Sequence, residues 1–155
     1  MLYALPGFEI MAVSALSVPL TGTTSETVLA TVSLPPIGAN GMVGIYMLFT
    51  ATVNNANVKT GRARLTNISG TVIAQASLAS FRTANREILL ANRNSVSSQA
   101  TFAGGTGTTL GGTTVAITTA SVDTSAGLDI VFTGQLASAS DTMELETYLV
   151  SILRR

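Results

Sequence analysis

The sequence contains no cysteine and no histidine among its 155 residues. Without cysteine it has no disulfides, no thiolate nucleophile and no cysteine-ligated metal centre. Without histidine it lacks the usual general base at neutral pH and the commonest metal ligand. We therefore expect no enzymatic activity, no cofactor and no metal site.

Charged residues are scarce and balanced. They make up 10% of the chain, with eight basic and eight acidic side chains. This leaves no basic field to attract DNA or RNA, so we expect no nucleic-acid partner. All but one of the basic residues are arginines, whose planar guanidinium suits fixed ion pairs and subunit interfaces.

Long hydrophobic runs are also missing. The longest, residues 42–53, is interrupted by Gly44, Thr50 and Thr52 and is too short to span a bilayer, so no membrane partner is expected. The first twenty residues have no basic n-region, and Pro6 and Glu9 interrupt their apolar stretch. We interpret them as mature sequence rather than a signal peptide.

Small and β-branched residues dominate what is present. Hydrophobic residues reach 46% of the chain while aromatic ones are only 5%, and many threonines and serines are interspersed. The length suits one domain with a sizeable core. A chain this apolar with so few charges often covers part of its surface with copies of itself or with another protein.

Short runs of Thr, Ser, Val and Ile bounded by Gly, Asn and Pro predict an all-β fold. Counted along the chain, they indicate about eight or nine antiparallel strands, which predicts a two-sheet sandwich, most simply a jelly roll. The segments are 26–34, 42–53, 58–68, 71–76, 86–91, 96–103, 113–120, 128–136 and 142–153.

Three finer expectations follow from the pattern. Residues 76–85 are the one place where a helical turn is plausible, and 58–68 should form a hairpin with 71–76. Period two places one set of side chains on a single face of strand 128–136 and a second set on a single face of 142–153. These sets are Leu128, Ile130, Phe132 and Leu136, and Met143, Leu145, Leu149 and Leu153.

The N-terminal segment, residues 1–25, is the least regular part of the chain. It carries Pro6, Pro19 and a Thr-Gly-Thr-Thr-Ser stretch at 21–25. We expect either an arm that reaches a neighbour or a first edge strand, followed by the jelly-roll domain over residues 26–155.

A glycine-rich stretch, AGGTGTTLGG at 103–112, resembles a phosphate-binding loop at first sight. Such loops need a following helix, whose N-terminus faces the phosphate, or a Lys-Ser/Thr pair after the last glycine. Here a β-branched run, TTVAITT, follows Gly112, and no lysine is near. We interpret the stretch as a connection between two strands.

The charged residues offer few candidates for chemistry. Glu144 and Glu146 lie two apart, as in a carboxylate pair for glycoside hydrolysis, but they alternate with apolar residues like a solvated or arginine-paired strand face. Asp123 and Asp129 are a weaker candidate for calcium. A second charged region contains Lys59, Arg62 and Arg64, which would pair with those glutamates within a subunit or across an interface, or bind a phosphate or sialic acid.

Two stretches resemble jelly-roll domains of tailed-bacteriophage virion proteins. SVDTSAGLDIVFTGQLASASDTMELETYLVSIL, residues 121–153, is similar to the closing hairpin of these domains; Asp123-Thr124, Gln135 and 137–142 carry the match. FTATVNNANVKTGRARL, residues 49–65, is similar to an earlier hairpin whose turn corresponds to Asn54, Asn55, Asn57 and Lys59. The resemblance implies homotrimers of a tumour-necrosis-factor-like sandwich, used in head decoration, head fibres and tail fibres.

Family members ending this way are often larger fibres, whereas the domain fills nearly all of this sequence. We therefore expect a decoration or cement subunit on the outer surface of a phage head, with itself and the major capsid protein as partners. The alternatives are a receptor- or carbohydrate-binding module of a tail or head fibre and, as the weakest, a cell-wall hydrolase. The candidate interface residues are Tyr3, Phe8, Arg62, Arg64, Glu144 and Glu146.

Overall fold

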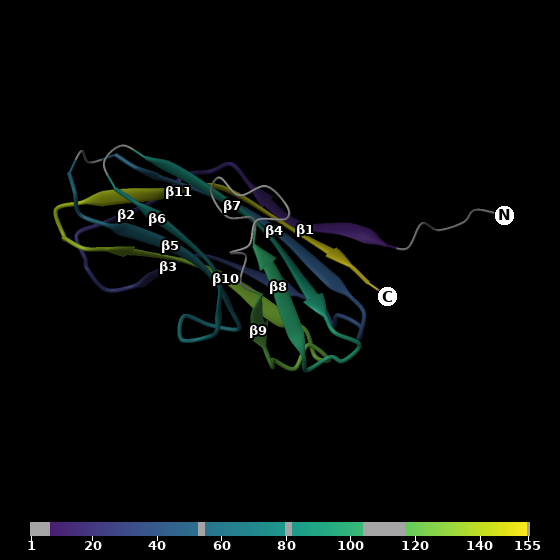
Figure 1. Ribbon diagram of the computed structural model, residues 1–155. Helices are drawn as coiled ribbons and strands as arrows, with labels where there is room; N and C mark the ends of the chain where they lie inside the picture. Colours follow the sequence, from purple (N-terminus) through teal and green to yellow (C-terminus); the bar gives the residue numbers. More distant parts are fainter. Residues whose placement is uncertain (1–6, 53–54, 80–81, 104–116, 155) are drawn as a thin grey trace.

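The computed structural model describes residues 7–52, 55–79, 82–103 and 117–154. In this part the chain forms β-strands joined by turns and loops (Figure 1), and no helix is long and apolar enough to cross a membrane. The strands are β1 (Phe8–Ser14), β2 (Val18–Thr21), β3 (Thr27–Leu34), β4 (Met42–Ala51), β5 (Lys59–Leu65), β6 (Val72–Leu78), β7 (Thr83–Asn92), β8 (Gln99–Ala103), β9 (Thr118–Ala120), β10 (Leu128–Leu136) and β11 (Thr142–Leu153).

The strands form two antiparallel sheets. The seven-stranded sheet has the order β1-β11-β4-β7-β8-β9, with β2 also paired to β11, and the four-stranded sheet has the order β3-β10-β5-β6. Setting β2, β8 and β9 aside and numbering the remaining eight strands in chain order, the sheets read 1-8-3-6 and 2-7-4-5. That is the strand order of a jelly roll, so the predicted fold class is confirmed.

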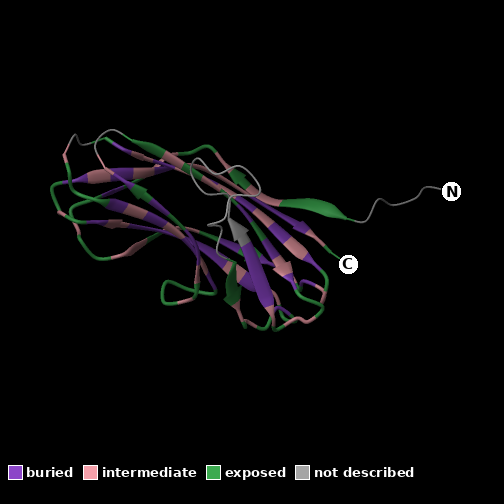
Figure 2. Cartoon of the chain, in the orientation of Figure 1, coloured by how far each residue is buried: buried purple, intermediate pink, exposed green. Residues whose placement is uncertain are grey.

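The core lies between the sheets. Buried residues alternate with half-buried or exposed ones along most strands, as Figure 2 shows in purple, pink and green. Val43, Ile45, Met47 and Phe49 of β4 point inward and are almost completely buried. Opposite them, the ring of Phe132 in β10 stacks on the ring of Tyr148 in β11, with 4.9 Å between the ring centroids.

β10 and β11 have the predicted bounds, but the predicted face of β11 is right only in its first half. Met143 and Leu145 are buried, whereas Leu149 and Leu153 lie half-buried on the outer side. The cause is a β-bulge: β11 pairs with β4 in one register up to Leu145 and in a shifted register from Thr147. The extra residue exchanges the two faces, so Val150 and Ile152 enter the core instead.

The expected helical turn at 76–85 is wrong for the described residues. β6 runs on to Leu78 and β7 begins at Thr83, because the alternation of buried and exposed side chains continues through both ends. The hairpin of β5 and β6 is confirmed. The predicted strand 113–120 is represented by β9, from Thr118, and its residues 113–116 lie outside the described part.

The N-terminal segment includes two strands. β1 runs antiparallel to the second half of β11, and β2 pairs with the first half of the same strand. Much of segment 1–25, for which the sequence allows either an arm or an edge strand, therefore lies along the seven-stranded sheet. Residues 1–6, with Tyr3, are outside the described part.

Candidate assembly interface

The outer side of the seven-stranded sheet carries apolar side chains where a soluble sandwich would place polar ones. β4 alternates strictly, so Met42, Tyr46 and Leu48 point away from the core and are half-buried. Its neighbour β11 contributes Leu149 and Leu153 to the same side, as a result of the bulge. From Met42 to Leu48 of β4 and from Leu149 to Leu153 of β11, both central strands therefore carry apolar side chains on both sides.

Strand register aligns these side chains into rows, because directly paired residues lie on the same side of a sheet. One row crosses four strands through Phe8, Leu153, Met42 and Ala91. The next row contains Ile10, Ser151, Gly44 and Leu89. A third row begins with Val13, Leu149 and Tyr46 and ends at Glu87.

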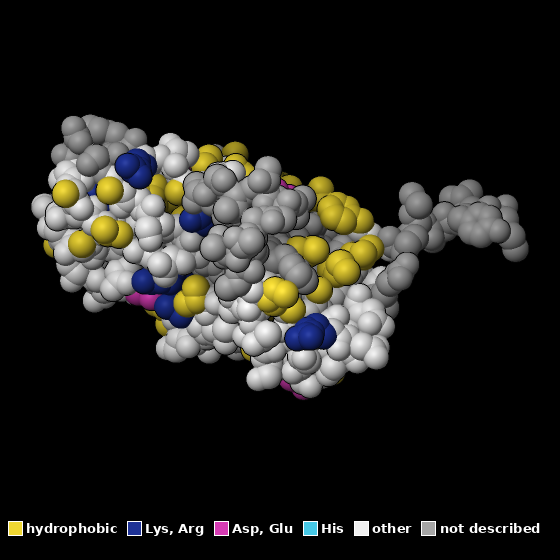
Figure 3. Space-filling view, in the orientation of Figure 1, with side chains coloured by type: hydrophobic (Ala, Val, Ile, Leu, Met, Phe, Trp, Pro, Cys, Tyr) yellow, Lys and Arg dark blue, Asp and Glu magenta, His cyan; other side chains and the backbone are white. Residues whose placement is uncertain are grey.

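The edge strand β1 is the most exposed part of this surface. Phe8 is 68% exposed, Ile10 58% and Val13 68%, and Leu89 of β7 is 40% exposed. Figure 3 shows hydrophobic side chains gathered on the visible surface around β1 and the adjoining strands. We call this surface the apolar face and define it by Phe8, Ile10, Val13, Met42, Tyr46, Leu89, Leu149 and Leu153.

Glu144 and Glu146 lie on the same side of the sheet, toward its other end. The hydroxyl of Ser17 donates a 2.5 Å hydrogen bond to Glu144 Oε2, and the Thr50 hydroxyl donates one of 2.5 Å to Glu146 Oε1. Both carboxylates are thus held by hydroxyl groups of neighbouring segments. The structure places these two candidates beside the apolar face, where they form a polar margin.

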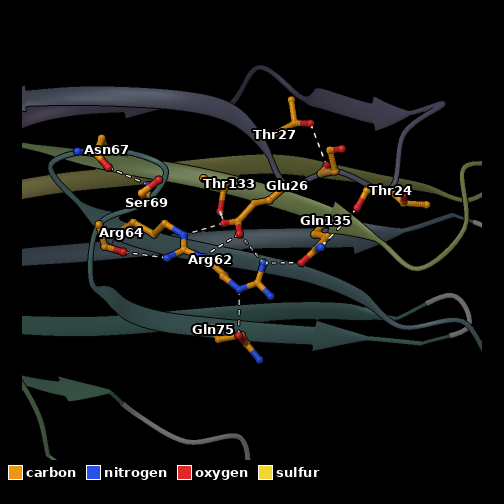
Figure 4. Close-up of polar contacts among 12 residues, drawn as sticks. Thr24, Glu26, Thr27, Arg62, Arg64, Asn67, Ser69, Gln75, Thr133 and Gln135 are labelled. Atoms are coloured by element: carbon orange, nitrogen blue, oxygen red, sulfur yellow. Dashed lines mark hydrogen bonds and ion pairs between the residues drawn. The ribbon is translucent and has the colours of Figure 1, made fainter.

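Arg62 and Arg64 lie elsewhere, on the outer side of the four-stranded sheet, and their partner within the chain is Glu26. Arg64 holds this carboxylate with two parallel bonds, Nε to Oε1 at 2.7 Å and Nη2 to Oε2 at 2.8 Å. Arg62 Nη1 lies 3.1 Å from Oε2, and the hydroxyl of Thr133 donates to Oε1. Figure 4 shows both guanidinium groups converging on Glu26.

The electrostatics of this cluster follow from its geometry. Hydrogen bonding from Arg64, assisted by Thr133 and by the charges of both arginines, lowers the pKa of Glu26 against the opposing effect of burial. The same pair raises the pKa of Arg64. Arg62 is further fixed by Gln75 and Gln135, at 3.1 and 3.0 Å. The guanidinium donors are largely occupied, so the cluster stiffens the sheet surface more than it offers an open anion site.

Lys59 does not belong with these arginines. Alternation along β5 turns Lys59 into the sandwich, where its side chain is completely buried beside Asp141. Arg62 and Arg64 face outward because they are an odd number of residues away. The three residues are close in the sequence, but the pleat of β5 places Lys59 on the side opposite Arg62 and Arg64.

The weaker candidates gain little from the structure. Asp123 is exposed and accepts a backbone hydrogen bond from Ser125, which lowers its pKa. Among the described residues, no group of three or more acidic, histidine or cysteine side chains is placed to hold a metal ion. Most of the glycine-rich stretch, residues 104–112, lies outside the described part.

Sequence reasoning named only Phe8 on the apolar face. Ile10 and Val13 could have been predicted from the sequence, because FEIMAV is an apolar run within the irregular N-terminal segment. Leu149 and Leu153 were predicted to share a face with Met143 and Leu145, because the bulge leaves no mark in the sequence pattern. Glu26 was missed as the partner of the arginines because it is 36 or more residues away in the chain.

No protein-family model matches the chain, and no curated protein sequence matches it. Similar solved structures include the CBM2 module of the evolved Dit of Lactobacillus casei BL23 phage J-1, at 12% identity and TM-score 0.43 over 81% of this chain and 69% of that one. The infectious bursal disease virus VP2 subviral particle has 10% identity and TM-score 0.43, over 97% of this chain and 33% of VP2. Lectin II from Ulex europaeus has 12% identity and TM-score 0.38, over 94% and 91%. Such low identities and TM-scores carry no functional argument, and the jelly roll rests on the strand order described above.

Proposed function

We propose that the chain is a structural subunit of a bacteriophage virion that trimerises through the apolar face and decorates the outside of the head. The observation that carries the proposal is the apolar face itself, which extends in register across β1, β11, β4 and β7. Exposed apolar surface of this extent is typical of protein interfaces. The resemblance of residues 121–153 to virion jelly rolls supports the assignment to a phage particle.

A second copy of the chain is the partner that fits this surface best. The apolar face carries almost no charge, with Glu87 at one margin and the half-exposed Glu9–Arg154 pair at the β1 edge. In a three-fold ring the contacts are heterologous, so one part of the apolar face on each copy would cover a different part of it on the next copy. Complete burial of a Phe, Ile, Val or Leu side chain contributes about 1.5–3 kcal/mol, and here several lie together.

The decoration role adds the major capsid protein as a second partner. With the apolar face covered by neighbouring copies, the outer side of the four-stranded sheet and the ends of the sandwich are left for the shell. Interfaces of this kind are richer in arginine than the rest of a protein surface, and Arg62 and Arg64 lie on that sheet.

The role is tested by adding purified protein to expanded capsids that lack it. Binding in sedimentation, together with resistance of the particles to heat and low salt, supports the proposal. Particles that bind no protein and are equally resistant without it contradict the decoration role.

The rival interpretation, a receptor- or carbohydrate-binding module, predicts that labelled protein binds host cells. Sugar sites usually present exposed aromatic rings. In the described part Tyr148 is packed on Phe132 and Tyr46 lies half-buried within the apolar face, and the exposed ring of Phe8 belongs to that same face. Cell binding by a protein that ignores capsids would favour this rival.

A further inference from the structure

Three polar side chains meet at one end of the sandwich in an arrangement that the assembly role does not need. They are Lys59 at the start of β5, Asn55 in the bend before it, and Asp141 in the hairpin before β11. The side chains of Lys59 and Asp141 are completely buried, at 0% exposure each. Lys59 is also the only lysine of the chain.

The lysine amine lies against the amide of Asn55. Its Nζ donates a hydrogen bond to Asn55 Oδ1 at 2.6 Å, which places the amine next to the carbonyl carbon that carries this oxygen. Buried amines act as nucleophiles when a base stands beside them. Holding a nucleophile and its target in contact is equivalent to effective concentrations of about 10⁵–10⁸ M.

Asp141 contacts both nitrogens that such an attack would involve. Its Oδ2 lies 3.9 Å from Lys59 Nζ, and its Oδ1 accepts from Asn55 Nδ2. Asn57 Nδ2 also donates to Oδ1, at 3.4 Å. Oδ2, by contrast, is buried and accepts no hydrogen bond from any residue that the structure describes, which is rare for a carboxylate in a protein interior. An unpaired acceptor that faces the amine is where a proton from Lys59 would go.

We propose that Lys59 and Asn55 form an intramolecular isopeptide bond, with Asp141 as the base and acid. Asp141 Oδ2 takes one proton from the Lys59 ammonium, and the free Nζ attacks Asn55 Cγ. Asp141 passes a proton from Nζ to Nδ2, the Cγ–Nδ2 bond breaks and ammonia leaves. The products are a Lys59–Asn55 amide, a neutral Asp141 carboxylic acid and one ammonia, so atoms and charge balance.

The energetics of the site favour this product. A buried ion pair must overcome the desolvation of both charges. Here Lys59 Nζ and Asp141 Oδ2 are 3.9 Å apart, too far for a hydrogen bond between them. The reaction replaces the Lys59 ammonium and the Asp141 carboxylate with a neutral amide and a neutral carboxylic acid. The complete burial of Lys59 and Asp141 shields the amine and the carboxylate from water, while Asn55 itself is half-buried.

The test uses the full chain, purified and then unfolded in denaturant. An amine-reactive reagent should label the N-terminus but not Lys59, trypsin should fail to cleave after Lys59, and the peptide containing Asn55 and Lys59 should have lost one ammonia. The variants D141N and K59R should have no cross-link, and N67A, altered in an exposed turn, should retain it. Complete labelling of Lys59 in the unfolded wild-type chain would overturn the proposal.

Two features keep the result clear. Ring closure at Asn40–Gly41 also releases ammonia, but it leaves Lys59 reactive, so the labelling distinguishes the two events. The wild-type measurement alone decides the outcome, so a variant that fails to fold does not weaken the test. The bond is independent of trimerisation, and neither result bears on the other proposal.

Discussion

The ring of Phe49 in β4 lies directly over Gly61 in β5, across the core. A Cβ built at position 61 would lie 2.5 Å from the ring, well inside van der Waals contact. Phe49 is fully buried, so its ring is enclosed by other core residues. The glycine therefore allows the two sheets to approach at this point.

Gly61→Ala should reduce the free energy of unfolding by about 1–3 kcal/mol, because an added methyl group overpacks a closed core. Denaturant unfolding of the purified chain measures the effect. Gly7→Ala is the matched control: a Cβ there meets nothing within 4 Å, and its effect should be near zero. Equal stability of the two variants would show that the Phe49 ring moves aside to accommodate the added methyl group.

The Glu26 cluster predicts a loss of stability in acid. Because the pKa of Glu26 is lowered on folding, its charged form stabilises the fold above the ordinary value of 4.5. This contribution is lost as the pH falls through the lower pKa of the folded state. The free energy of unfolding should be measured from about pH 6 down to about pH 3, a range that spans the titration of carboxylates. It should decline more steeply for wild type than for Glu26→Gln.

At neutral pH, Glu26→Gln should cost about 1–3 kcal/mol, since both arginines lose a charged acceptor. Glu9→Gln is the control, because its bond to Arg154 is about half exposed and should contribute little. A Glu26→Gln variant as stable as Glu9→Gln would mean that the cluster is not held together by charge.

A buried amide network joins β7, β8 and the segment before β10. Gln99 Nε2 donates to Asn92 Oδ1 at 3.1 Å and to the Val122 carbonyl at 2.9 Å, and its Oε1 accepts from the Val122 N–H. Asn92 in turn donates to Thr124 Oγ1 at 2.9 Å. This network fixes the β7–β8 hairpin to the rest of the sandwich.

Gln99→Leu should therefore destabilise the fold by about 2–4 kcal/mol, because it leaves several buried groups without partners. The exposed Gln75→Leu change, on the outer side of β6, should cost far less. Thermal unfolding of both variants checks this difference. Similar melting temperatures would show that water replaces the lost bonds.

The sandwich was predictable because period two and turn residues repeat over most of its strands. Strands β10 and β11 were placed to the residue, since each is bounded by clear turn signals. The bulge after Leu145 was not predictable, because one unpaired residue changes the faces without changing composition. The apolar face depends on that bulge, which moves Leu149 and Leu153 to the side opposite Met143 and Leu145, with which period two had grouped them.

The charged candidates show a similar limit. Arg62 and Arg64 stand out in the sequence, yet their partner Glu26 lies just before β3, which only the strand order β3-β10-β5 brings close to them. Lys59 was grouped with them, although β5 points it to the opposite side. Local spacing determines the face of a strand, but long-range pairing determines what that face meets.

The central claim, assembly through the apolar face, is tested most directly by the mass of the protein in solution. Light scattering coupled to gel filtration at micromolar concentration should give three times the chain mass of 15.9 kDa. The double variant Ile10→Asp, Leu89→Asp should give a folded monomer, and Val58→Asp, exposed on the other sheet's side, should remain trimeric. A wild-type chain that elutes as a folded monomer at all concentrations would contradict the account.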